Sequence, residues 1–156
     1  MTVRLADAAA TARAGRLLAP LLAAGDAIGL VGELGAGKTA LAQAVIAALG
    51  APGAATSPTF TIVDEHPGGR LPVWHADLYR IERARDLEEI GLDEIVGRGA
   101  GVVLVEWADR FAVLPADHLR VTLAVDGDGR TLDAVGTGPR GRALAAAWLA
   151  ALAASG

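Results

Sequence analysis

The amino-acid sequence predicts an α/β fold, a three-layer sandwich whose sheet is mixed and mainly parallel and carries a C-terminal antiparallel hairpin. Two short apolar runs, residues 27–31 and 101–106, are typical of buried strands. A glycine-rich loop follows the first run and leads into residues 40–49, whose apolar positions recur with helical spacing. Residues 119–125 alternate between apolar and polar side chains and end at the turn 126–129, which predicts the hairpin.

Length and composition favour a single domain over residues 1–156. The formal net charge of −4 argues against a large nucleic-acid footprint, which needs a basic surface. The lack of cysteine excludes disulfides and thiolate metal sites. The first residues lack the basic and apolar regions of a signal peptide, and the Ala-rich stretch 143–154 is too short to span a membrane. We therefore expect no membrane contact and a cytoplasmic location.

The N-terminal part is expected to begin with an edge strand at residues 3–5. Asp7 is a suitable N-cap for a helix over residues 8–22. Pro20 is expected to end or kink this helix, because proline has no backbone N–H to donate.

The middle of the chain is predicted to add a hairpin and two short helices. The turn at residues 67–70 joins an expected strand at 60–63 to another at 71–77. Residues 82–96 are predicted to form two short helices divided by Gly91. In the C-terminal part, a strand at 130–135 completes the hairpin, and a helix at 139–154 closes the fold.

The phosphate-binding pattern G-x-x-x-x-G-K-[ST] is matched by Gly32-Glu33-Leu34-Gly35-Ala36-Gly37-Lys38-Thr39, with a strand before it and a helix after it. Its glycines let backbone N–H groups point inward at an anion. Lys38 can reach the β- and γ-phosphates of a nucleotide, and the Thr39 hydroxyl can ligate Mg²⁺. The pattern predicts nucleoside triphosphate binding by Glu33, Leu34, Gly35, Ala36, Gly37, Lys38, Thr39 and Ala40.

Two acidic residues lie where expected strands end, downstream of the phosphate loop. Glu106 closes the apolar run 101–106, the place where an acid faces the metal in phosphate-loop proteins. It can reach Mg²⁺ through water or act as a base, and the simpler interpretation is an acid that ends a strand by chance. Asp77 lies near the end of the strand at 71–77, where it can bind Mg²⁺ through water, orient an attacking water, or cap the next helix.

Three further features allow both a functional and a structural interpretation. Ser57, Pro58 and Thr59 can sense the γ-phosphate as a switch segment does, or form an ordinary turn. The acidic run at residues 82–94 is a solvated helix face or a docking surface for a basic partner. Thr11, judged on its local pattern alone, is a solvated or capping hydroxyl.

Five motifs occur in one order at close spacing: the phosphate loop, Ser57-Pro58-Thr59-Phe60, His75-x-Asp77-x-Tyr79-Arg80, Leu87-Glu88-Glu89-Ile90-Gly91-Leu92 and Glu106-Trp107. Together they resemble the TsaE (YjeE) family, the small bacterial ATPases of tRNA threonylcarbamoyladenosine biosynthesis. The resemblance covers nearly the whole chain. Many proteins share the phosphate loop, whereas the combination with the four later motifs is far more specific.

The resemblance implies a site that uses ATP and Mg²⁺. It implies that Thr39 ligates the metal directly, that Glu106 lies at the Mg²⁺, and that Asp77 is an essential active-site residue. Lys38 would neutralise charge developing on the γ-phosphate, while the two acids position or activate water. The segment at residues 57–59 would behave as a switch.

By the same resemblance, Thr11 lies near the nucleotide, Trp107 lies beside the site, and Tyr79 and Arg80 flank it or face a partner. The implied partners are TsaD and TsaB, which carry out threonylcarbamoyl transfer to the adenosine next to the tRNA anticodon. Slow ATP hydrolysis would reset that complex between turnovers. Contact with tRNA is expected to be indirect.

Two other classes of protein use the same loop. A small-molecule kinase needs an acceptor pocket and an Arg-bearing lid. Here Arg80, Arg83 and Arg85 are the clustered arginines after the loop, and they alternate with acids. A regulatory nucleotide switch would act mainly through binding, which the acidic run at 82–94 and residues 57–59 would serve equally well.

Overall fold

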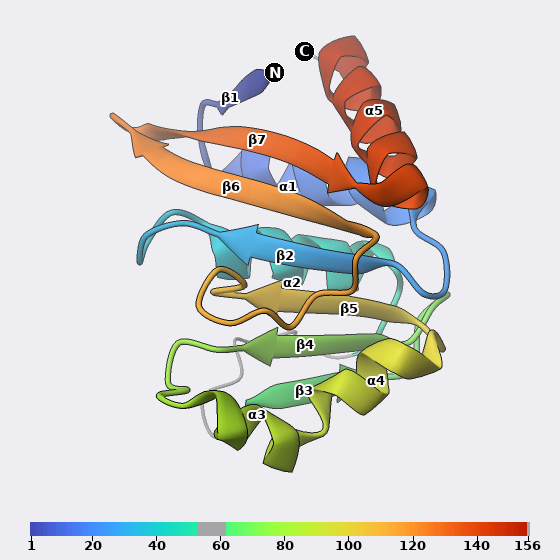
Figure 1. Ribbon diagram of the computed structural model, residues 1–156. Coiled ribbons are helices and arrows are strands. Elements are labelled where there is room, and N and C mark those ends of the chain that lie inside the picture. Colours follow the sequence, from blue (N-terminus) through green and yellow to red (C-terminus); the bar gives the residue numbers. More distant parts are fainter. Residues whose placement is uncertain (53–61, 156) are drawn as a thin grey trace.

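Residues 1–52 and 62–155, which the computed structural model describes, form one sheet with helices on both faces (Figure 1). The strands are β1 (Thr2–Leu5), β2 (Ala27–Val31), β3 (Val63–His66), β4 (Val73–Asp77), β5 (Val102–Glu106), β6 (His118–Asp126) and β7 (Gly129–Thr137). The helices are α1 (Ala8–Leu18), the 3₁₀ turn η1 (Ala19–Leu21), α2 (Lys38–Ala48), α3 (Ala84–Ile90), α4 (Leu92–Arg98) and α5 (Gly138–Ser155). Across the sheet the strand order is β1-β7-β6-β2-β5-β4-β3.

The four central strands, β6, β2, β5 and β4, run parallel to one another, and the outer strands pair antiparallel. All residues of β2 and β5 are buried, as expected for parallel strands covered on both faces. The β6–β7 hairpin joins this centre through β6, which lies parallel to β2. The predicted mixed sheet with a C-terminal antiparallel hairpin is confirmed.

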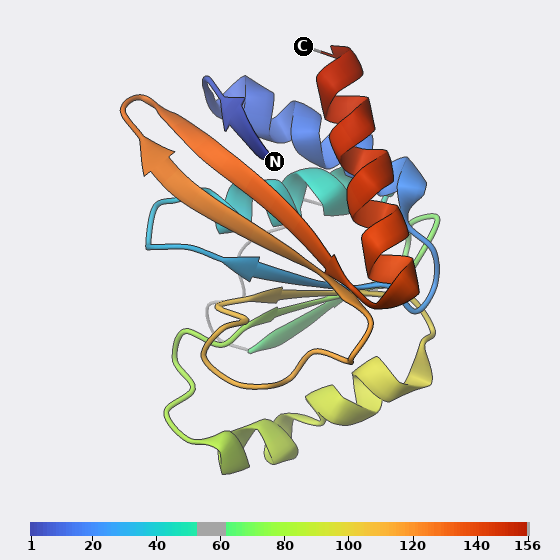
Figure 2. The same ribbon diagram turned by 45° about the horizontal axis from the view of Figure 1, so that its top comes forward.

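Two apolar clusters lie on opposite faces of the sheet. The larger cluster joins α1, α2 and α5 to the strands, through side chains such as Leu18, Ile28 and Leu104. The smaller cluster joins α4 and the loop after β5 to the strands, through side chains such as Leu92 and Val103. Figure 2 shows α1, α2 and α5 on one side of the sheet and α3 and α4 on the other. The predicted three-layer sandwich is therefore confirmed.

The N-terminal elements follow the prediction closely. Asp7 caps α1 by accepting a hydrogen bond from the backbone N–H of Ala10 at 2.8 Å. The α-helix ends before Pro20, which lies in the 3₁₀ turn η1, as its missing N–H requires. The α2 helix begins at Lys38 rather than at Ala40, so the last residues of the phosphate loop already belong to the helix.

The first strand of the middle hairpin extends further along the chain than predicted. In the described part of the chain it runs over Val63–His66 and so continues past the predicted end at residue 63, because its register pairs Val63 with Ala76 and His66 with Val73. Residues 60 and 61 lie outside the described residues. In the C-terminal hairpin the alternation holds up to Leu123, whereas Val125 is 51% exposed near the turn.

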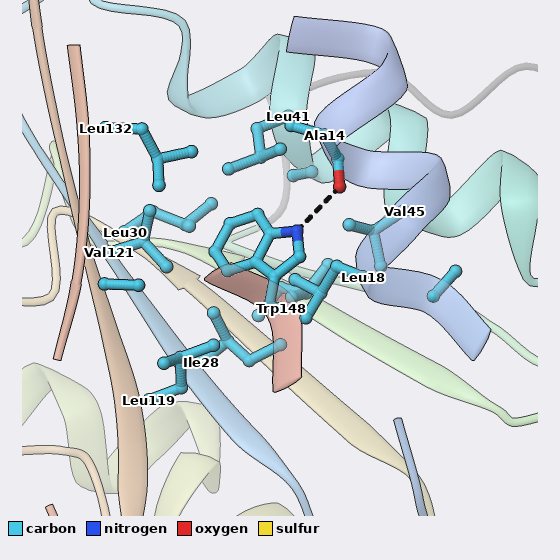
Figure 3. Packing of buried hydrophobic residues seen from close by; sticks show 14 of the residues in the cluster. Ala14, Leu18, Ile28, Leu30, Leu41, Val45, Leu119, Val121, Leu132 and Trp148 are labelled. Carbon is cyan, nitrogen blue, oxygen red and sulfur yellow. Dashed lines mark hydrogen bonds between the residues drawn. The ribbon is translucent and has the colours of Figure 1, made fainter. Parts of the chain in front are cut away.

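The Ala-rich helix α5 is anchored to the core by Trp148 (Figure 3). The indole is fully buried, and its Nε1 donates a hydrogen bond to the carbonyl oxygen of Ala14 in α1 at 2.9 Å. Side chains from both helices and the sheet surround the ring, among them Leu18, Leu119 and Leu132. Among the helices of the described ranges, α5 included, none has the length and apolar character needed to cross a bilayer.

Two carboxylates fix the start of α5. Asp117 accepts hydrogen bonds from the backbone N–H groups of Arg140 at 3.0 Å and Gly141 at 2.6 Å. These bonds, the one from Gly141 most strongly, lower the pKa of Asp117. The Arg140 guanidinium in turn donates to the buried carboxylate of Asp26 at 2.9 and 2.7 Å, which raises the pKa of Arg140. Since Asp26 directly precedes β2, the pair ties α5 to the central strand.

Replacement of Trp148 tests how much this anchor contributes to the free energy of unfolding. Trp148→Ala removes a fully buried ring and is expected to lower the free energy of unfolding by about 3–5 kcal/mol. Trp148→Phe keeps most of the volume but loses the hydrogen bond to Ala14, so a smaller loss of about 1–2 kcal/mol is expected. Urea unfolding followed by circular dichroism measures both. Equal losses in the two variants would contradict this account of the anchor.

The cap at Asp117 is expected to make stability depend on pH. Because its pKa is lowered in the folded chain, the carboxylate stabilises the fold above its ordinary value near 3.8 and loses this effect as the pH falls through the lowered value. Asp117→Ala should therefore be less stable than the parent at pH 7, and the difference should shrink in acid. Urea midpoints measured between pH 7 and pH 3 test this. A difference that does not change with pH would rule out a charged cap.

Candidate functional site

The candidate site lies at the carboxyl edge of the parallel strands, where β2, β5 and β4 end side by side. The strand register pairs Leu30 of β2 with Glu106 of β5, and Glu106 with Asp77 of β4. In open α/β sheets, ligands bind in the crevice at this edge. The register therefore places both predicted acids beside the phosphate loop that follows β2.

The phosphate loop turns at two glycines with left-handed backbone, Gly35 (φ 83°) and Gly37 (φ 104°). Residues with an L side chain rarely adopt these angles, so the loop needs glycine at both positions. The α2 helix begins at Lys38, directly after the loop. The N–H groups of its first turn lack partners within the helix and are suited to bind an anion.

Lys38 provides a buried ammonium group inside the loop. Its Nζ donates hydrogen bonds to the carbonyl oxygens of Gly32 at 2.5 Å and Glu33 at 2.8 Å. It also lies 4.1 Å from the centre of the Trp107 ring. Burial lowers the pKa of Lys38, and nearby carboxylates, Glu106 foremost, oppose this shift. Carbonyl oxygens of the loop thus hold the group that is predicted to meet the phosphates.

Glu106 is only 2% exposed, and both of its carboxylate oxygens have a partner. Oε1 accepts a hydrogen bond from the hydroxyl of Thr39 at 2.7 Å. Oε2 lies 2.6 Å from Nε2 of His75, a fully buried residue of β4. Glu106 therefore joins three elements of the site: the first turn of α2, the end of β5, and β4.

Asp77 closes β4, and its Oδ1 accepts a hydrogen bond from the backbone N–H of Tyr79 at 3.0 Å. The alternative in which Asp77 caps the next helix is wrong, because α3 begins at Ala84 and Arg83 occupies its N-cap position. Asp77 is half-buried. Its hydrogen bond to Tyr79 stabilises the turn after β4.

Trp107 follows Glu106 with a left-handed backbone (φ 58°), which is uncommon for any residue with a side chain. Such a conformation costs on the order of 1 kcal/mol, and conformations of this kind cluster at functional sites. It places the indole over Lys38 and beside Tyr79, with the two ring centres 5.0 Å apart. Arg110 supports this pair by donating a hydrogen bond to the carbonyl oxygen of Tyr79.

These side chains surround a cavity of about 390 Å³. A second cavity of about 250 Å³ shares Gly37, Ala40 and Arg130 with the first and reaches Thr11. The two cavities therefore meet at the start of α2. The wall of the first cavity consists of Leu34, Gly35, Gly37, Lys38, Thr39, Ala40, Asp77, Tyr79, Glu106, Trp107 and Arg130.

Most of the predicted site residues thus come together at these two cavities, and their roles stay predictions. Glu33 contributes its carbonyl oxygen to Lys38 and is not part of either wall, and Ala36 is buried in the apolar core. Arg80 is exposed after β4 and is not part of either wall. The predicted switch residues lie outside the described part of the chain; they are Ser57, Pro58 and Thr59.

Two residues that the sequence prediction did not select belong to the site. His75 contacts Glu106, and the signal for it is its spacing, since residues two apart on a strand share a face and Asp77 is two residues on. Arg130 donates from Nε and Nη2 to the carbonyl oxygen of Gly35 at 3.2 and 3.0 Å. No local signal reveals Arg130, because 95 residues separate it from the loop that it contacts.

Another cavity, of about 420 Å³, lies at the amino end of β2, away from the phosphate loop. Its charged wall residues include Asp26, Asp117 and Arg140, which hydrogen-bond to one another or to the start of α5. Because these charged groups already form hydrogen bonds that hold α5 against the sheet, they have a structural role. The residues predicted to bind the nucleotide lie at the carboxyl edge instead.

The donors at the carboxyl edge suit Mg²⁺, a hard cation that prefers oxygen ligands and usually takes some of them from water and nucleotide phosphates. The hydroxyl of Thr39 and the carboxylate of Glu106 are such ligands, and they lie 2.7 Å apart. Within residues 1–52 and 62–155, no group of three or more His, Cys, Asp or Glu could hold a metal without help.

Comparison with known proteins places the chain in a family. The model of the family described as "Threonylcarbamoyl adenosine biosynthesis protein TsaE" matches residues 5–132. A tRNA threonylcarbamoyladenosine biosynthesis protein TsaE from Nostoc sp. is 39% identical over 129 residues, which are 80% of this chain and 78% of that protein. The proteins of the same name from Bacillus subtilis and Streptomyces coelicolor are 41% identical over 125 residues and 44% identical over 113 residues. These two alignments cover 78% and 70% of this chain, and 77% and 75% of the relatives.

The fold agrees with the sequence comparisons. The crystal structure of Bacillus subtilis YdiB matches with a TM-score of 0.79 and 32% identity, covering 96% of this chain and 94% of that one. The range matched by the family model includes the phosphate loop, Asp77 and Glu106. On both grounds, the chain belongs to the TsaE family.

Proposed function

We propose that this protein binds ATP with Mg²⁺, hydrolyses it slowly, and acts on the TsaD–TsaB complex in tRNA threonylcarbamoyladenosine biosynthesis. One observation carries the proposal: Lys38, Thr39, Asp77 and Glu106, which come from three separate elements, line one cavity beside the phosphate loop. The names of the relatives place those proteins in the biosynthesis of this modified nucleoside, which supports the same process for this chain.

The phosphates are expected to bind where the loop meets α2. Backbone N–H groups of the loop and of the first helical turn would hold them, with Lys38 exchanging the carbonyl oxygens of Gly32 and Glu33 for phosphate oxygens. The second cavity, which Thr11 and Arg130 line, is then a suitable place for the nucleoside. Its size and its position next to Ala40 support this assignment.

Thr39 and Glu106 would hold the Mg²⁺, because they supply adjacent oxygen ligands at the start of α2. When bound, the cation neutralises negative charge on the β- and γ-phosphates. Both acids line the cavity, but Glu106 is almost fully buried with one oxygen on the Thr39 hydroxyl, whereas Asp77 is half-buried. We therefore assign metal binding to Glu106 and the orientation of the attacking water to Asp77.

The partner surface is expected on the face that carries α3 and α4. The acidic side chains of this segment are mostly exposed, among them Glu88, Glu89 and Asp93, and α3 has no fully buried residue. A basic patch on a partner would complement this surface. The net charge of −4 supports an indirect relation to tRNA, since direct binding needs a basic face.

The proposal is tested by Lys38→Ala in a reconstituted complex with TsaD and TsaB. Loss of the ammonium group should lower Mg-dependent release of phosphate from ATP by roughly 100-fold or more, because it removes the positive charge proposed to stabilise the γ-phosphate during transfer. Phosphate release is followed over time in a coupled assay. Arg142→Ala on α5 removes an exposed cation that lies outside both cavity walls and away from α3 and α4, and the Mg-dependent rate should stay near that of the parent.

Two outcomes would contradict the proposal. Unchanged hydrolysis in Lys38→Ala would show that the loop does not carry the reaction. A phosphorylated small molecule as the product, in place of free phosphate, would indicate a kinase.

A further inference from the structure

His75 is an ionisable side chain in a place where the fold gives it no contact with solvent. It lies in β4, fully buried, next to β5 in the parallel part of the sheet. Its Nε2 lies 2.6 Å from Oε2 of Glu106. A buried polar side chain lowers the stability of the fold unless it is hydrogen-bonded. The role of His75 is therefore to be sought in its contact with Glu106.

The proton on His75 can be assigned from its surroundings. An ionised carboxylate only accepts hydrogen bonds, so Nε2 carries the proton and donates to Glu106. The other ring nitrogen, Nδ1, is buried and has no partner in the part of the chain that the structure describes. The hydrogen bond to Glu106 therefore requires a proton on Nε2, whatever Nδ1 carries.

The contact also determines how Glu106 is oriented. One oxygen of the carboxylate is held by His75, so the other oxygen faces Thr39, whose hydroxyl donates to it at 2.7 Å. Without His75 the carboxylate could rotate, or Oε2 would be buried without a partner. Groups that hydrogen-bond to a metal ligand in this way orient it, and their loss typically costs 10–100-fold in metal affinity.

We propose that His75 is a positioning residue for the metal site: its Nε2–H holds Glu106 so that Oε1 points at Thr39, and this sets the affinity of the site for Mg²⁺. The inference rests on the proposed function, in which Thr39 and Glu106 bind the cation of the nucleotide. It assigns to His75 no contact with the nucleotide and no proton transfer.

A matched pair of variants tests this role. In His75→Gln the side-chain amide can reach the position of Nε2 and donate to Glu106, whereas in His75→Asn the amide is one methylene too short. The probe is mant-ATP, whose binding is measured by fluorescence first in EDTA and then over a Mg²⁺ titration. His75→Asn should raise the Mg²⁺ midpoint by roughly 10–100-fold, and His75→Gln should stay within about 3-fold of the parent. Affinity for mant-ATP in EDTA should be unchanged in both variants.

His66→Leu is the control, because it alters another histidine, on the neighbouring strand β3, whose buried Nε2 has no partner among the described residues. Its Mg²⁺ midpoint should equal that of the parent. Equal midpoints for His75→Gln and His75→Asn would overturn the inference, as would a loss of affinity already present in EDTA. Thermal unfolding of each variant confirms that folded protein is being compared. Failure of the proposed function is seen separately, as a parent protein that binds no mant-ATP with or without Mg²⁺.

Discussion

The parallel register of β2, β5 and β4 is the constraint on which the rest of the site depends. It sets the end of β2 beside Glu106 and sets Glu106 beside Asp77, so the phosphate loop and both acids open at one edge. A shift of one residue in β5 would turn Glu106 to the other face of the sheet and remove it from Thr39. The buried apolar faces of β2 and β5 oppose such a shift, because they would have to exchange places. Packing on both faces of the sheet thus fixes the geometry of the polar site.

The site holds two side chains of opposite charge, Lys38 and Glu106, which are almost inaccessible to solvent. Each is stabilised there by its hydrogen-bond partners and other close contacts. Glu106 has Thr39 and His75 as partners, and Lys38 has two carbonyl oxygens and the face of Trp107. Leaving either charge without partners would cost several kcal/mol. In the proposed function, a phosphate group entering the loop would meet a cation that is already positioned, and Lys38 would exchange carbonyl oxygens for phosphate oxygens. This is the physical sense in which the loop is preorganised.

Local chemistry made most of the fold predictable. The buried runs of β2 and β5, the cap at Asp7, the break at Pro20 and the turn between β6 and β7 are all dictated by neighbouring residues. The positions of the loop residues and of the two acids at strand ends could also be predicted, because a known sequence pattern and the rule for parallel sheets apply to them. The contact of His75 with Glu106 and that of Arg130 with Gly35 were not predicted, since they span 31 and 95 residues; the two-residue spacing to Asp77 is a local signal for His75, and Arg130 has none. The extent of β3 was missed for the same reason, because pairing with β4 decides it.

The central claim is that the cavity at the carboxyl edge holds Mg-ATP through Lys38, Thr39 and Glu106. A crystal structure with Mg²⁺ and a non-hydrolysable ATP analogue tests it most directly. We expect Nζ of Lys38 to leave the carbonyl oxygens of Gly32 and Glu33 for phosphate oxygens, while Glu106 keeps its contact with His75. A nucleotide bound elsewhere, or one bound in the cavity with Lys38 still on those carbonyl oxygens, would contradict it.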